Sequence, residues 1–233
     1  MTDKYHMTQE QNIFVAKRNI IDYIWKSAQL EGLSVTYPDT EAIFNGMAVP
    51  GVKVSEIVAV NNLKHAWQFL LDTLDVPFDY AYLCKLNQLV GGDSLILDAG
   101  QLRKWPVLIG GTTWKPDMPD DMAIRQRLRE LQEVEGITER AITLMLYIMR
   151  GQFFLDGNKR TAMLAANQVM ISGGAGVITV PIEQQREFTR LLVDYYESNN
   201  MDAMMQFVYD CCIDGIAFDN GEAPGSEGTP AQS

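Results

Sequence analysis

Five consecutive residues of the sequence combine a carboxylate, a glycine, an amide and two cations: Asp156, Gly157, Asn158, Lys159 and Arg160. Apolar spacing predicts one helix that ends just before this run and a second helix that begins at about Asn158. Lys159 and Arg160 would then lie in the first turn of the second helix, where the helix dipole disfavours cations. A bound anion, held by backbone N–H groups and by both side chains, would remove this conflict. The run therefore predicts an anion-binding loop.

Two residues of this loop suggest how it would hold a ligand. Gly157 would let the backbone approach the anion closely, because it has no side chain. Asp156 beside a phosphate is a candidate Mg²⁺ ligand, since Mg²⁺ commonly bridges one or two carboxylates and phosphates. The alternative is a solvated turn with ordinary helix charges, because one loop pattern alone is weakly specific.

The composition indicates a folded chain and limits its partners. Of 233 residues, 47% are hydrophobic and 21% are charged, which is typical of one domain or of a domain with a small appendage. The formal net charge of −11 disfavours nucleic acid as a partner, since an acidic surface repels phosphate backbones. The longest uncharged stretch, residues 161–182, is interrupted by glycines. It predicts a helix, a glycine break and a short strand rather than a membrane span, so no membrane partner is expected.

Histidine and cysteine are scarce in the chain. The two histidines, His6 and His65, argue against a His-rich metal site. The three cysteines, Cys84, Cys211 and Cys212, are odd in number and two are adjacent, which argues against a disulfide framework. A reducing compartment fits this usage, so a cytoplasmic location is expected.

Helical periodicity dominates most of the chain. Thr8 and Gln11 resemble a capping box, and Gly32 is in the place of a helix stop, so these residues should bound the first helix. Residues 33–51 indicate an irregular connection, and Ser55 is the expected cap of the next helix. Further helices are expected at residues 79–90, 120–135, 138–149, 158–171, 182–198 and 202–212.

Residues 101–119 interrupt the helical pattern. β-branched and aromatic residues flank Gly110-Gly111, which predicts a β-hairpin with Ile109 before the turn and Thr112 after it. The expected fold class is therefore mostly α, with one small β-hairpin. The C-terminal residues lack apolar side chains and are expected to form a flexible acidic tail.

The anion loop resembles the signature loop of Fic-domain proteins, which reads H-x-F-x-[D/E]-G-N-[G/K]-R. The residues that match it in order and spacing are Phe154, Asp156, Gly157, Asn158, Lys159 and Arg160. The expected hairpin is similar to the family's flap. Ser27, Glu31 and Gly32 fit the family's inhibitory motif, [S/T]-x-x-x-E-[G/N]. Three motifs in the family's order make the resemblance strong.

The resemblance implies a Fic-type helical bundle with a defined division of the chain. Residues 1–33 would form an N-terminal helix with the inhibitory-type motif, and residues 34–213 the helical core. Within that core, the flap would occupy residues 101–119 and the signature loop residues 150–160. Residues 214–233 would be the flexible tail.

The resemblance also implies an activity, the transfer of AMP from ATP to a hydroxyl side chain of a target protein. Asp156 would bind Mg²⁺ on the phosphates, and Phe154 would anchor the loop in the core. Gly157, Asn158, Lys159 and Arg160 would form the anion cradle, with Asn158 and Arg160 among the catalytic residues. The flap would clamp the target segment by strand addition. The oligomeric state is left open, with a homodimer as one alternative.

The chain departs from the family at the general base, because the family's histidine falls at Gln152. A neutral amide cannot accept a proton near pH 7, and general-base catalysis typically contributes about 10²- to 10⁴-fold. Gln can still orient a nucleophile by hydrogen bonding, as in some GTPases. Three functions follow: an impaired transferase, an inactive Fic-fold module that binds a nucleotide or a protein, and a Doc-like phosphotransferase, which Lys159 favours.

The inhibitory motif departs from the family in its partner. Glu31 is expected at a helix C-terminus, where the dipole disfavours a carboxylate. The family's partner is a second Arg, and that position here is Met163. Arg160 is therefore predicted to pair with Glu31, because its guanidinium can bind a carboxylate through two hydrogen bonds. Lys159 is the other candidate, and a solvated helix end is the alternative.

Overall fold

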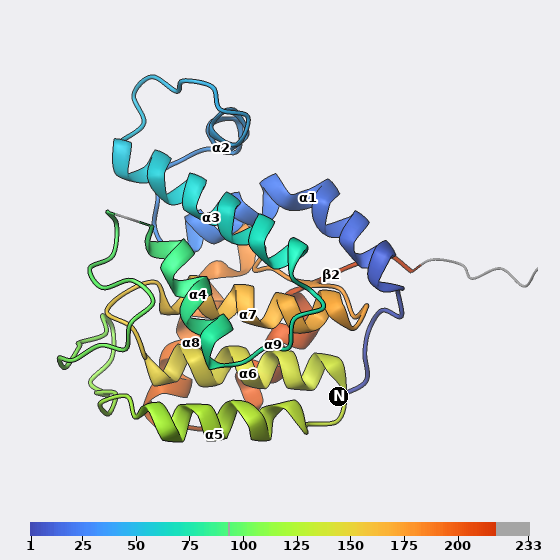
Figure 1. Ribbon diagram of the computed structural model, residues 1–233, viewed down its shortest axis with the longest axis vertical. Coiled ribbons are helices and arrows are strands. Elements are labelled where there is room, and N and C mark those ends of the chain that lie inside the picture. Colours follow the sequence, from blue (N-terminus) through green and yellow to red (C-terminus); the bar gives the residue numbers. More distant parts are fainter. Residues whose placement is uncertain (93, 218–233) are drawn as a thin grey trace, which may run out of the picture.

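The computed structural model describes residues 1–92 and 94–217 and is mostly helical (Figure 1). The helices among these residues are α1 Gln9–Leu30, α2 Tyr37–Phe44, α3 Val54–Asp72, α4 Tyr80–Gly91, α5 Asp121–Gln132, α6 Ile137–Gly151, α7 Asn158–Ser172, α8 Gln185–Ser198 and α9 Asp202–Cys211, with a 3₁₀ turn at Ile182–Gln184. The strands are β1 Val177–Ile178 and β2 Ile213–Asp214, which pair antiparallel. The predicted class, mostly α with one small sheet, is confirmed.

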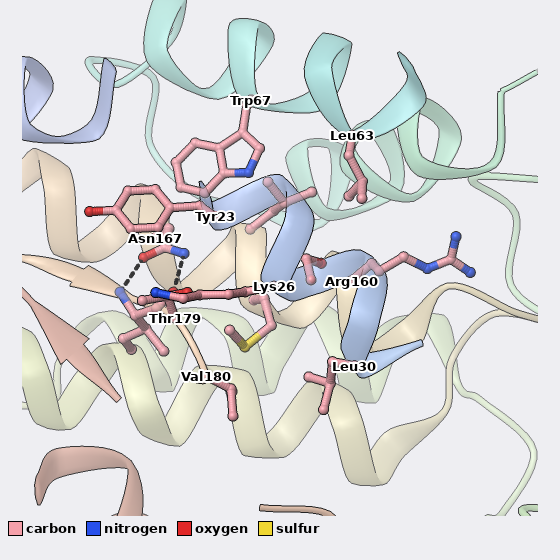
Figure 2. Close-up of a pocket in the computed structure, with 13 residues that line it drawn as sticks. Tyr23, Lys26, Leu30, Leu63, Trp67, Arg160, Asn167, Thr179 and Val180 are labelled. Carbon is pink, nitrogen blue, oxygen red and sulfur yellow. Dashed lines mark hydrogen bonds between the residues drawn. The ribbon is translucent and has the colours of Figure 1, made fainter. Parts of the chain in front are cut away.

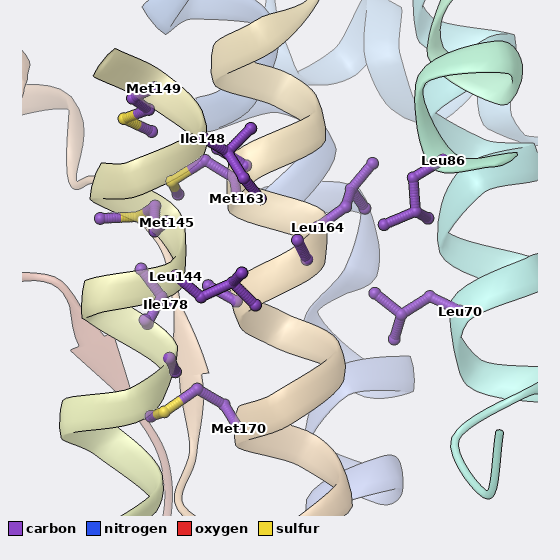
Figure 3. Close-up of a cluster of buried hydrophobic side chains, with 14 of the residues drawn as sticks. Leu70, Leu86, Leu144, Met145, Ile148, Met149, Met163, Leu164, Met170 and Ile178 are labelled. Carbon is purple, nitrogen blue, oxygen red and sulfur yellow. The ribbon is translucent and has the colours of Figure 1, made fainter. Parts of the chain in front are cut away.

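Helix α7 lies at the centre of the bundle. It packs against α6, α4, α1, α3 and β1, and every residue from Arg160 to Ile171 is buried. Figure 3 shows the side of α7 that faces α6, where Leu144 and Ile148 of α6 pack against Met163 and other apolar residues of α7. A helix buried on all faces cannot shift without repacking its neighbours. The first turn of α7, which holds the candidate anion site, is therefore fixed by the core.

Helix α1 begins and ends as the sequence predicts. The Gln11 N–H donates to Thr8 Oγ1 (3.1 Å), and the Thr8 N–H donates to Gln11 Oε1 (2.8 Å), which completes the capping box. The helix ends at Leu30, with Glu31 as its C-cap and Gly32 in a left-handed conformation at φ 76°. A residue at positive φ ends the helix at little cost only when it is glycine.

Two expectations for the following segment are wrong. The connection at residues 33–51 contains helix α2, which begins with a capping box between Thr36 and Asp39 and has a proline in its first turn. A proline in the first turn is compatible with a helix, because that N–H needs no partner. Ser55 does not cap α3, which begins at Val54 without a side-chain cap.

The sheet is also not where the hairpin was expected. Residues 101–119 form no strand, and Gly110-Gly111 is a turn between segments without backbone pairing. The strand pair instead joins residues 177–178, which follow the glycine break after α7 as predicted, to residues 213–214. Asn167 of α7 holds β1 by two hydrogen bonds to the Ile178 backbone, of 2.6 and 2.9 Å (Figure 2).

The C-terminal expectations are met only in part. Asp214, which was assigned to the flexible tail, belongs to β2 and accepts a hydrogen bond from the Tyr23 hydroxyl of α1 (2.6 Å). Most of the predicted acidic tail, residues 218–233, lies outside the described residues. Within residues 1–92 and 94–217, no helix is both long and apolar enough to cross a bilayer.

Candidate functional site

The signature loop connects α6 to α7 through two left-handed residues. Gln152 is the C-cap of α6 at φ 45° and ψ 53°, and Gly157 precedes α7 at φ 77°. A Cβ at Gly157 would come within 2.8 Å of Ile96 and 3.0 Å of Val90. Glycine is therefore required here by the backbone angle and by the core behind the loop. The sequence had suggested close approach of an anion as the reason.

Asn158 holds the loop closed from inside. Its Oδ1 accepts the Phe154 N–H (3.0 Å), and its Nδ2 donates to the Phe154 carbonyl (2.8 Å). The same Nδ2 donates to Gln152 Oε1 (3.2 Å). Phe154 itself is only 1% exposed, so it anchors the loop in the core as the resemblance implied. The side-chain amide of Asn158 donates to two groups within the loop, so its main role is to hold the shape of the loop.

Both polar ends of the Gln152 amide are engaged. Its Nε2 donates to the Met149 carbonyl (2.6 Å), and its Oε1 accepts from Asn158. The Tyr196 phenol lies against the same amide: burial raises the pKa of Tyr196, the hydrogen bond with Gln152 lowers it, and the negative charge of Glu31 raises it further. Gln152 thus acts as a cap for α6 and for the loop.

The two charged residues that begin and end the run face each other. Arg160 Nη2 lies 3.5 Å from Asp156 Oδ1, and the same oxygen accepts the Gly157 N–H (2.5 Å). The Asp156 side chain is 65% exposed, whereas Arg160 is buried and its Nε has no hydrogen-bond partner in the described structure. Figure 2 shows the guanidinium pointing away from Tyr23 and Trp67.

Glu31 pairs with Lys159, so the predicted pairing with Arg160 is wrong. Lys159 Nζ lies 3.6 Å from Glu31 Oε1 and 3.4 Å from the Leu30 carbonyl. The Glu31 side chain is 16% exposed and that of Lys159 is 32% exposed, so the carboxylate is not in bulk solvent. Arg160 faces Asp156, four residues earlier in the chain, instead of Glu31.

One groove brings the inhibitory, loop and flap residues together. Its volume is about 270 Å³. It is lined by Glu31, Val107, Leu108, Ile109, Gly110, Gln152, Leu155, Asp156, Asn158, Lys159, Thr189, Leu192, Val193 and Tyr196. Polar and charged groups come from the loop and from α1, and apolar walls come from the flap and from α8. A nucleotide needs both kinds of surface, one for its phosphates and one for its base.

Several predicted site residues lie outside this groove. Ser27 lines a separate small cavity of about 20 Å³, together with Met163 and Arg160. Gly32 and Gly157 shape the backbone but do not line the groove. Met163, at the position of the family's second Arg, is buried in apolar surroundings, so it supplies no cation to the groove.

The flap is anchored by side chains in place of strand pairing. Glu197, at the end of α8, accepts hydrogen bonds from the Thr112 hydroxyl and from the Thr113 N–H (2.7 Å). Trp114 stacks on Tyr196 with ring centroids 5.5 Å apart, and the Arg150 guanidinium lies 4.4 Å from the Trp114 ring. These contacts hold the flap over the groove.

Two buried polar residues of the site were not found from the sequence. Asn87 of α4 donates to the Asp156 carbonyl (3.0 Å), and its Oδ1 accepts the Gly100 N–H (2.8 Å), so it supports the loop from behind. A polar residue on the apolar face of a predicted helix is the signal that could have indicated it. Arg103 connects the flap to the loop, and no local pattern marks it.

The site fits Mg²⁺ only in the company of phosphates. No group of three or more His, Cys, Asp or Glu side chains that could hold a metal occurs within the part of the chain that the structure describes. Asp156 is a single exposed carboxylate with one oxygen that takes no hydrogen bond. Mg²⁺ is usually bound by one or two carboxylates together with substrate phosphates, which matches this arrangement.

The flap contact at Glu197 should depend on pH. Hydrogen bonds from the Thr112 hydroxyl and the Thr113 N–H hold the pKa of Glu197 below its ordinary value. A carboxylate with a lowered pKa in the folded state stabilises that state above its unfolded pKa, and this contribution is lost as pH falls through the folded pKa. We therefore expect the Thr113 amide signal in NMR spectra to titrate at a pH below the ordinary pKa of a glutamate carboxyl. In a Glu197→Gln variant the signal should not titrate, and identical profiles in both proteins would contradict the assignment.

The signature loop, the helices α6 and α7 that it connects and the flap that covers the groove lie largely within one segment that matches a known family. Residues 77–170 match the family described as Fic/DOC. The match covers the signature loop and the helices on either side of it, so the resemblance that the sequence indicated is confirmed.

Curated relatives bear names that agree with this family. A protein adenylyltransferase fic-1 of Caenorhabditis elegans is 26% identical over 181 residues, which is 71% of this chain and 34% of the relative. A protein adenylyltransferase Fic of Drosophila yakuba is 24% identical over 204 residues, 84% of this chain and 41% of the relative. The chain thus spans well under half the length of these relatives.

Solved structures show the same fold. Fic-1 of Caenorhabditis elegans superposes with a TM-score of 0.72 at 21% identity, over 84% of this chain and 62% of that one. A Fic domain containing signaling protein of Bacteroides thetaiotaomicron superposes with a TM-score of 0.71 at 17% identity, over 88% of this chain and 85% of that one.

Proposed function

We propose that this chain transfers AMP from ATP to a hydroxyl side chain of a target protein, at a rate limited by Gln152. The observation that carries the proposal is the groove in which Lys159, Asp156 and Gln152 meet beneath the flap. The family match and the adenylyltransferase relatives support the same reaction class.

The phosphates of ATP would bind at the first turn of α7. The free N–H groups of that turn and its dipole attract an anion, and Lys159 borders the groove at the same end. Arg160, whose Nε lacks a partner, would turn from Asp156 toward a phosphate. Mg²⁺, held by Asp156 and the phosphates, would neutralise negative charge on the leaving pyrophosphate.

The target would bind along the flap. Backbone N–H and C=O groups of residues 107–111 make no hydrogen bonds within the described structure, and this segment forms one wall of the groove. An extended target segment could pair with these groups as an added strand, which would place a side-chain hydroxyl near the loop. The missing hairpin pairing thus leaves the flap backbone free for a partner.

Gln152 is the reason to expect slow transfer. Its amide caps α6 and accepts from Asn158, so it offers no group that could take the hydroxyl proton near pH 7. The same engagement favours a second function, a Fic-fold module that binds a nucleotide or a protein and transfers nothing. The Doc-like alternative, which transfers a phosphate, rests on Lys159 and on Met163 in place of the family's second Arg.

Two assays test the proposal and separate the alternatives. Calorimetry with ATP and Mg²⁺ measures binding, and a Lys159→Met variant should weaken it while a Lys17→Met variant, with its change on α1, should not. Incubation with α-labelled ATP detects transfer of AMP to the chain itself or to proteins of a lysate, and γ-labelled ATP detects transfer of phosphate. Absence of ATP binding in both the intact chain and the Glu31→Gly variant would overturn the proposal. Binding without any label transfer would select the inactive module.

Removing the Glu31 carboxylate should tighten ATP binding. The carboxylate occupies Lys159 at 3.6 Å, on the side from which phosphates would approach. The Glu31 carboxylate and the ATP phosphates would compete for Lys159, which is partly exposed and therefore screened by solvent. We expect the affinity for ATP to increase about tenfold, or by ~1.4 kcal/mol, when the carboxylate is removed. Calorimetry of Glu31→Gly checks this.

The chain offers a matched control for that variant. Glu133 is the C-cap of α5, as Glu31 is the C-cap of α1, and it does not line the groove. Glu133→Gly should therefore leave the ATP affinity unchanged. Equal affinities in the intact chain and in Glu31→Gly would show that Glu31 does not compete with the nucleotide.

A further inference from the structure

Arg103 is a buried cation without a salt bridge among the described residues; burial lowers its pKa, and the negative charge of Asp117 raises it. Its side chain is 3% exposed, and it forms no salt bridge with any residue in the described ranges. A buried charge is costly unless hydrogen bonds compensate for it. In this structure backbone carbonyls accept these hydrogen bonds. The role of Arg103 is therefore to hold those carbonyls in position.

The guanidinium of Arg103 joins three segments. Nε donates to the Gln152 carbonyl of the signature loop (2.6 Å), and Nη1 donates to the Trp105 carbonyl at the start of the flap (2.9 Å). Nη2 donates to the Pro116 carbonyl (3.3 Å) and to the Asp117 carbonyl at the end of the flap. One side chain therefore closes the base of the flap and attaches it to the loop.

The backbone of Arg103 adds a second link between the same segments. Its N–H donates to the Phe153 carbonyl (2.9 Å). The flap therefore meets the loop at two consecutive loop residues, Gln152 and Phe153, while Glu197 holds the flap tip to α8 from an exposed position. Of the two attachments, the one at Arg103 is buried and carries more hydrogen bonds per side chain.

Only an arginine fits this arrangement. Its planar fork presents donors in fixed directions, and three separate nitrogen atoms here reach carbonyls of three segments. A lysine would retain the charge with a single nitrogen, which cannot reach all of these carbonyls. Loss of the fork would leave buried carbonyl groups without donors.

We infer that Arg103 is a positioning residue that couples the flap to the signature loop, so that a nucleotide bound at the loop also fixes the flap for the target. The inference rests on the proposed function for its ligand. The mechanical coupling of flap and loop does not depend on the ligand and can be measured without it.

Hydrogen–deuterium exchange of the unliganded protein tests the coupling. In Arg103→Lys, amides of residues 105–118 and of residues 152–157 should both exchange at least about tenfold faster, while amides of α9 stay unchanged. Arg140→Lys is the matched control, because Arg140 Nε also donates to a backbone carbonyl, that of Val134 (3.0 Å), at a place remote from the groove. Faster exchange of the flap with an unchanged loop, or no change in either segment, would overturn the inference.

A second arm uses ATP with Mg²⁺ on the same proteins. In the intact chain, ATP should slow exchange in residues 105–118, and in Arg103→Lys it should still bind within a few-fold but give no flap protection. If Arg103→Lys does not fold, the response of the intact chain decides, and a flap that ignores bound ATP overturns the inference. If ATP binds to neither protein, the proposed function fails while the unliganded comparison still decides the coupling.

Discussion

Replacing Gln152 with His should raise the rate of AMP transfer about 10²- to 10⁴-fold, the usual contribution of a general base. Position 152 lines the groove at the C-terminus of α6. An imidazole there would titrate near its ordinary pKa of about 6.5, and the helix C-terminus would favour its protonated form after proton uptake. Gln152 is therefore the residue whose replacement should change activity most.

The measurement is the initial rate of label transfer from α-labelled ATP, with binding measured in parallel. Gln152→Ala serves as the control, since it removes the same amide without providing a base and should not raise the rate. Adding Glu31→Gly to Gln152→His should raise the rate further, because it frees Lys159 for the phosphates. A double variant that binds ATP but transfers no faster than the intact chain would show that the scaffold itself is not competent for transfer.

Truncating Phe154 should cause the largest loss of stability at the site, about 3–5 kcal/mol in the free energy of unfolding. The ring is fully enclosed in the core at 1% exposure, and its backbone N–H and C=O are both bonded to Asn158. Phe154→Ala would therefore leave a cavity below the loop and loosen the loop's internal hydrogen bonds.

Urea unfolding followed by circular dichroism measures that loss. Phe14→Ala is the matched control, because Phe14 is 57% exposed on α1 and its truncation should change the free energy of unfolding by no more than about 0.5 kcal/mol. Equal effects of the two substitutions would contradict the view that Phe154 anchors the loop.

Local signals in the sequence predicted helix ends best where those ends lie at residues with strong local preferences. The capping box of α1, the Gly32 stop and the glycine break after α7 lie where they were expected. Helix α2 was not expected, although its capping box is a local signal and its proline is compatible with a first turn. The hairpin was predicted from residue types alone, whereas side-chain contacts to α8 and Arg103 determine the path of the flap.

The site was predictable where it is continuous in sequence and not where it is assembled in space. The loop from Gln152 to Arg160 and the approach of Glu31 to it were expected and are observed. The choice of Lys159 over Arg160 depends on the direction in which each side chain leaves the first turn of α7. Sequence spacing does not give that direction, and it gives no sign that Arg103 reaches the loop.

The central place of α7 also determines when the chain can fold. Helices α1, α3, α4 and α6 all pack on α7, which is completed only at Ser172. During synthesis, the chain must therefore leave the ribosome as far as Ser172 before α7 can cover the apolar faces of α1, α3 and α4, and exposed faces of this kind favour aggregation. A truncated chain that ends before α7 would lack the helix on which the others assemble, so the N-terminal helix and the remainder should fold only as one cooperative unit.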